Sequence, residues 1–78
     1  PILDAARRSI EEGYVSGGSQ RNLAWVHEHL DADAGVTDDD LLLLADAQTS
    51  GGLLVVGEVP GHPVIGETVG GDARIRIR

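Results

Sequence analysis

The chemically most promising stretch of this sequence runs from Ala45 to Val56, where a polar turn with two glycines leads into an apolar segment. The pair Gly51-Gly52 permits backbone angles that other residues avoid and leaves main-chain amides open to an anion or a neighbouring segment. Leu53 to Val56 is a short run of branched apolar side chains, which predicts a central strand. Loops that lead into such strands often carry a binding function. The same residues also fit a tight turn whose glycines serve geometry alone.

A second glycine pair, Gly17-Gly18, precedes a predicted helix from about Gln20 to Leu30, with Ser19 as its N-cap. A glycine-rich loop at a helix N-terminus can hold an anion, because amides and the helix dipole point toward it. The phosphate-loop lysine and spacing are missing here, so a plain turn and a weak anion site both remain open.

Residues that could bind a metal are present, but their spacing argues against it. His27 and His29 lie two apart on the predicted helix and point in different directions. Asp31 and Asp33 match the start of a calcium-binding loop, yet the glycine and glutamate that such a loop needs later are missing. We therefore expect this chain to bind no metal or cofactor by itself.

Composition excludes several classes of function. The 78 residues contain no cysteine and no lysine, so neither a thiolate nucleophile nor a lysine base is available. Thirteen acids against six arginines give a net charge of −7, which argues against nucleic acid as a partner. The apolar runs are too short to span a bilayer. We expect one small cytoplasmic domain over residues 1–78, with no membrane partner.

Helix signals are clear in the first half of the chain. Pro1 and Asp4 suit a first helical turn and Gly13 suits a helix end, so a helix is predicted over residues 1–13. Thr37 is expected to cap a short helical turn in which Asp40 occupies the capping-box position.

Strand signals dominate the second half. Leu41 to Leu44 are expected to be buried, and strands are predicted at residues 53–59, 64–69 and 73–78, the last two joined by a hairpin loop at Gly70-Gly71-Asp72. Together these elements predict an α+β fold. Two helices and a short helical turn would pack on a small, mostly antiparallel three-stranded sheet.

Asp46 to Leu54, read D-A-Q-T-S-G-G-L-L, resembles the D-[PA]-Q-T-S-G-G-L-L signature in the C-terminal domain of selenophosphate synthetase, also called selenide, water dikinase. Residues 13–22 and 64–69 resemble further pieces of that domain in the same order. The resemblance covers nearly the whole chain. It implies the α+β fold of the aminoimidazole ribonucleotide synthetase superfamily, of which this chain would be a partial C-terminal domain.

The intact enzymes of that family use ATP and magnesium to form selenophosphate from selenide, which makes them transferases of the kinase type. Their cysteine or selenocysteine, its partner lysine and the metal-binding aspartates lie upstream of the region that this chain resembles. The resemblance therefore implies a C-terminal fragment that is inactive alone, with no catalytic or metal-binding residue of its own. Whether the chain counts as an enzyme stays open. The alternative is a stand-alone interaction or anion-binding module on the same scaffold.

The residues carried over from the family form two loops, which we expect to lie close together near a substrate or anion: Gly17, Gly18, Asn22, Asp46, Gln48, Thr49, Ser50, Gly51 and Gly52. Expected partners are the N-terminal domain of a synthetase or a second copy of the chain. The sequence departs from the family between residues 57 and 63, where relatives usually carry a helix-containing segment. We expect that loss to leave one face of the sheet uncovered.

Overall fold

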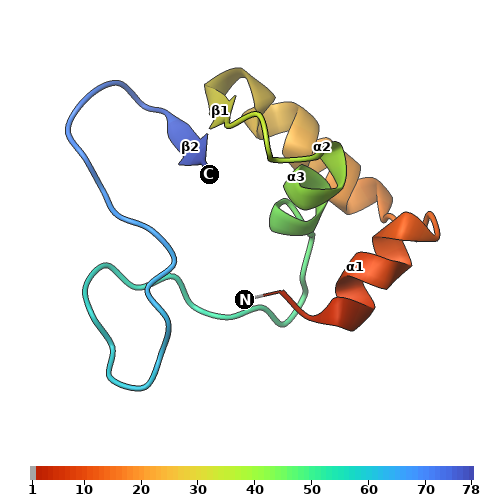
Figure 1. Ribbon diagram of the computed structural model, residues 1–78, viewed down its shortest axis with the longest axis horizontal. Helices are drawn as coiled ribbons and strands as arrows, with labels where there is room; N and C mark the ends of the chain where they lie inside the picture. The colour runs from red at the N-terminus through yellow and green to blue at the C-terminus, as the bar shows by residue number, and fades with distance from the viewer. Residues whose placement is uncertain (1) are drawn as a thin grey trace.

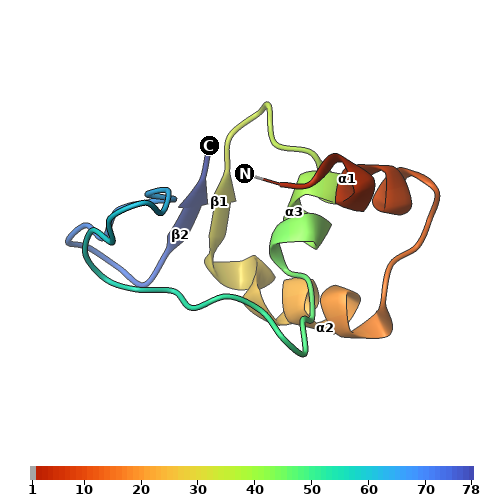
Figure 2. The same cartoon turned by 90° about the horizontal axis from the view of Figure 1, so that it is seen from below.

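A computed structural model describes residues 2–78. Three α-helices gather on one side of the molecule, a small two-stranded ribbon lies beside them, and a long irregular segment loops out on the far side (Figures 1 and 2). In chain order the elements are α1 (Asp4–Glu11), α2 (Gly17–Val26), the 3₁₀-helix η1 (His27–His29), β1 (Leu30–Ala32), α3 (Asp38–Leu44) and β2 (Ile75–Ile77).

The first helix ends where the sequence predicts. Gly13 has a φ of 88°, its amide donates to the Ile10 carbonyl at 2.8 Å, and the Tyr14 amide donates to the Ser9 carbonyl at 2.9 Å. This pair of bonds is a Schellman motif, which needs a left-handed residue at Gly13 and closes the carbonyl end of α1. Asp4 stands in the first turn, as expected. Pro1 lies outside the described residues.

The second helix begins earlier than the sequence predicts. Its N-cap is Ser16, whose hydroxyl accepts from the Ser19 amide at 3.0 Å, so the expected cap at Ser19 is wrong. Gly17 and Gly18 form the first turn of α2 because the serine before them already supplies the cap. The α-helix also stops at Val26, and the chain continues through η1 into β1, whereas the predicted helix reaches Leu30.

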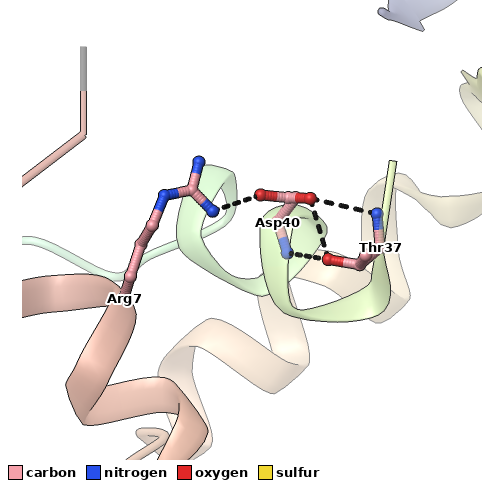
Figure 3. Close-up of polar contacts among 3 residues, drawn as sticks. All are labelled: Arg7, Thr37 and Asp40. Carbon is pink, nitrogen blue, oxygen red and sulfur yellow. Dashed lines mark hydrogen bonds and ion pairs between the residues drawn. The ribbon is translucent and has the colours of Figure 1, made fainter. Parts of the chain in front are cut away.

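The third helix carries the predicted capping box. Thr37 Oγ1 accepts from the Asp40 amide at 3.2 Å, and Asp40 Oδ2 accepts from the Thr37 amide at 3.1 Å. Asp40 also accepts from Arg7 of α1 at 2.6 Å, which ties α3 to α1 (Figure 3). The hydrogen bond from Arg7, followed by those from Thr37, lowers the pKa of Asp40 from 3.8 to about 2.

The three α-helices pack through half-buried side chains. Helix α3 contacts both α1 and α2, and Figure 2 shows it between them. The half-buried apolar residues of these helices are Ala6, Ile10, Leu23, Val26, Leu41, Leu42 and Leu43. Leu44 is 57% exposed, so burial of the whole leucine run is a wrong expectation. No apolar side chain among residues 2–78 is fully buried, so the helices share a shallow core.

The sheet differs from the one predicted. It has two strands, β1 and β2, paired in parallel with Leu30 opposite Ile75 and Asp31 opposite Arg76. The predicted three-stranded, mostly antiparallel sheet is therefore wrong, although helices and strands do combine. Within the predicted strand over residues 73–78, only Ile75–Ile77 is a strand. Its register places the apolar Leu30 and Ile75 opposite each other and the oppositely charged Asp31 and Arg76 opposite each other, and the predicted hairpin with residues 64–69 does not form.

Residues 49–73, here called the arm, contain no helix or strand, and every one of their side chains is exposed. The strands expected at residues 53–59 and 64–69 are absent from this described segment. Leu53, Leu54 and Val56 are 93%, 84% and 87% exposed. Strand propensity reflects how a residue fits a covered, pleated surface, and the exposed side chains of the arm have no such cover.

Candidate functional site

The structure brings together one turn of α2 and the residues that follow α3. Asn22 Nδ2 donates to the Ala45 carbonyl at 3.1 Å, and Ser19 Oγ donates to Asp46 Oδ1 at 2.9 Å. Ser19 and Asn22 lie three apart, so they share one face of the helix. The two glycine-containing loops singled out in the sequence therefore meet through Gly18, Asn22 and Asp46.

Ser19 is the centre of this contact. It is 3% exposed, and it is the one residue in the described part of the chain that counts as buried. Its hydroxyl bonds to Asp46, shares a 2.9 Å bond with Ser16 Oγ, and lies 3.4 Å from the Ala47 amide that donates to it. A serine hydroxyl offers one donor and two acceptor positions, so all three are used.

Gly18 permits the close approach of the two segments. A Cβ at this position would lie 2.7 Å from the Cβ of Ala47, closer than two such atoms can come. Gly17 is different, because its Cβ would meet only the end of the Arg21 side chain at 3.3 Å. Glycine is therefore required at position 18 because there is no room for a side chain.

The remaining signature residues form an exposed turn at the start of the arm. The positive φ values belong to Gly13, Gly57, Gly61 and Gly71, and Gly51-Gly52 adopts angles that other residues can also take. The expectation that this glycine pair adopts backbone angles closed to other residues is therefore wrong. A Cβ on Gly51 would lie 2.7 Å from Gln48 Oε1, the movable end of a side chain. Gln48 to Gly52 are all exposed.

A shallow, open depression of about 480 Å³ lies where this turn meets α3. Its walls combine apolar side chains with the carboxylate of Asp46, the amide of Gln48 and the backbone of the glycine pair. The lining residues are Leu43, Leu44, Asp46, Gln48, Gly51, Gly52, Leu53, Leu54 and Ile65. Thr49 and Ser50 belong to the same turn without lining the depression.

The depression offers few charged groups to a ligand. Asp46 is the one ionisable side chain lining the depression, and a single carboxylate makes a poor metal site. Within residues 2–78, no three histidine, aspartate or glutamate side chains gather closely enough to hold a metal ion. In the same part of the chain, no helix is long and apolar enough to cross a membrane.

Two residues of this contact, Ser16 and Ser19, are missing from the set predicted to form the site. Sequence reasoning treats serines before a helix as caps, and Ser16 is one. The bond between Ser19 and Asp46 joins residues 27 positions apart, and local patterns give no signal for such a contact.

Comparison with known proteins identifies relatives. The chain is 44% identical to selenide, water dikinase from Pseudomonas straminea over 55 residues, which cover 70% of this chain and 15% of that protein. It is 41% identical to the selenide, water dikinase of Myxococcus xanthus over 54 residues, covering 69% of the chain and 15% of the relative. With the Rhizobium meliloti enzyme of the same name, identity is 33% over 92 positions, covering 99% of this chain and 26% of that protein.

The chain is similar to part of selenide, water dikinases. The predicted resemblance to part of selenophosphate synthetase is thus confirmed. The segment spans 15 to 26% of the length of these relatives. The Rhizobium alignment runs over 92 positions, more than the 78 residues of this segment, so that relative carries residues without a counterpart here. No protein-family model matches the segment, and no solved structure matches it significantly.

Proposed function

We propose that this chain serves as a non-catalytic part of the C-terminal domain in a cytoplasmic selenide, water dikinase, an ATP-dependent transferase that forms selenophosphate. The observation that carries the proposal is the similarity to several proteins of that name, reaching across 99% of the chain for one of them. In the intact protein, the turn from Asp46 to Gly52 would contribute one wall of the space in which substrates are enclosed, opposite an N-terminal domain.

The residues present here do not fit ATP or magnesium. Phosphoryl transfer depends on metal ions and cations that neutralise the phosphates. The chain contains no lysine, and Asp46 is the one carboxylate beside the depression. We therefore assign nucleotide and metal binding to other parts of the synthetase, and this segment to shaping and closing the site.

The proposal is tested by offering the isolated chain ATP, magnesium and selenide and following selenophosphate by ³¹P NMR. No selenophosphate is expected, and formation of product at a rate proportional to the chain concentration would contradict the assignment. A full-length relative with the same signature serves as the positive control. In that relative, changing the glycine that corresponds to Gly51 to valine should lower turnover more than it lowers thermal stability.

The alternative, an anion-binding module, predicts a different result in a thermal-shift assay. A ligand that binds only the folded state raises the melting temperature. A shift with inorganic phosphate, and none with ATP and magnesium, would favour that alternative. The synthetase proposal predicts no shift with either.

A further inference from the structure

We propose that Ser19 is a positioning residue, which holds the Asp46 carboxylate and the Ala47 amide in place and so fixes the wall of the depression to α2. Asp46 is exposed and follows the end of α3, so nothing in its own segment would fix its side chain. Ser19, by contrast, is buried at the first turn of a capped helix. The rigid partner in this contact is therefore the serine.

The direction of the hydrogen bonds supports this role. The single hydroxyl hydrogen of Ser19 goes to Asp46, because a carboxylate can only accept. In the bond between the two serines, Ser16 must then be the donor. Ser16 thus orients Ser19, and Ser19 orients Asp46. Hydrogen bonds to a charged acceptor are the stronger kind, which suits a bond that has to fix a side chain at the surface.

The neighbouring contacts act on the same short segment. Asn22 holds the Ala45 carbonyl, and Gly18 allows Ala47 to lie against the helix. One turn of α2 therefore contacts and holds three consecutive residues, 45–47. These residues lie directly before the turn that lines the depression. The importance of these contacts for selenophosphate formation rests on the proposed function. The contacts themselves are independent of that proposal.

The test is amide hydrogen exchange, followed by NMR, on the 78-residue chain and three variants. Ser19→Ala should speed exchange of the Ala47 amide roughly tenfold, since it removes the acceptor of that amide and the donor to Asp46. Asp46→Asn retains an oxygen that can accept from Ser19, so Ala47 exchange should stay within about twofold of the parent. Ser16→Ala should speed exchange of the Ser19 amide, and it should speed exchange of the Ala47 amide less than Ser19→Ala does, because the Ser19 hydroxyl is kept but no longer oriented by Ser16.

The internal reference is the Ala45 amide, which donates to the Leu41 carbonyl at 3.0 Å and reports on the end of α3. Ser19→Ala should leave its exchange unchanged. Equal acceleration at Ala45 and Ala47 would overturn the proposal, because it would show general loosening of the fold. Unchanged exchange at Ala47 would overturn it as well. Neither outcome depends on turnover, so the positioning role and the synthetase assignment can fail separately.

Discussion

The helical unit, residues 4–45, and the arm, residues 49–73, both contain many apolar side chains, but only the first folds them against one another. Helices α1 and α3 are closed by local hydrogen bonds at Gly13 and Thr37, and α3 contacts both other helices. The arm has strand-forming residues and no partner for them. The contrast shows that a helix can be specified within one segment, whereas a strand needs a neighbour.

The relatives contain residues beyond those that align with this chain. The Rhizobium meliloti protein carries residues that have no counterpart in this chain, and every relative named above is several times longer. Under the proposed function, the exposed leucines and valines of the arm would pack on other parts of a synthetase.

The largest effect is expected inside the helical unit, at Gly18. Gly18→Ala should lower the free energy of unfolding by about 1–3 kcal/mol, because its Cβ would clash with Ala47 at 2.7 Å. Urea unfolding followed by circular dichroism measures the change. Gly17→Ala is the matched control, with an expected change near zero. A similar loss in both variants would show that the contact with Ala47 does not decide the result, since alanine favours a helix more than glycine does.

The capping box should produce the next largest effect. Thr37→Ala removes the acceptor for the Asp40 amide and should cost about 1 kcal/mol of stability. Thr37→Ser keeps a hydroxyl and should recover most of that loss. If serine and alanine at this position lower the free energy of unfolding equally, the loss comes from the methyl group of Thr37 and not from the cap.

Acid should loosen the contact between α1 and α3. The pKa of Asp40 is lowered from 3.8 to about 2 in the folded chain, so its carboxylate stabilises the fold above pH 3.8 and loses that effect as the pH falls toward 2. Asp40→Asn should reduce the fall in melting temperature between pH 5 and pH 2. Asp39→Asn, in the same helical turn, should leave that fall unchanged. Identical pH profiles for Asp40→Asn and the parent chain would contradict this prediction.

The smallest effect is expected in the arm. Leu54 is 84% exposed, so Leu54→Ser should change the free energy of unfolding by less than about 0.5 kcal/mol. The half-buried Leu43 is the comparison, and Leu43→Ala should cost roughly 1 kcal/mol or more. A large loss at Leu54 would show that the arm packs on the helices after all.

Sequence reasoning succeeds where the deciding interactions are local. The end of α1 at Gly13 and the box formed by Thr37 and Asp40 follow from residues a few positions apart. The start of α2 is misjudged because two serines, Ser16 and Ser19, both suit a cap, and the choice depends on whether the intervening glycines become helical. The strands fail because their outcome depends on a covering surface that no local pattern encodes.

For the candidate site, the glycine pair and the apolar run after it mark the turn from Asp46 to Gly52 in the sequence, and the resemblance to a family adds an expected role. The bond from Ser19 to Asp46 is not visible at all, since it depends on how α2 and α3 pack. The role of these residues in binding remains a prediction. Their position beside one another is a property of the fold.

Pulsed proteolysis with thermolysin tests the contrast between the two regions most directly. The protease cleaves before leucine, isoleucine and valine, which occur in both the helical unit and the arm. Mass spectrometry of the first fragments should place the earliest cuts between residues 53 and 69, with α1, α2 and α3 left intact. Earliest cuts within the helices, while the arm stays whole, would contradict the account.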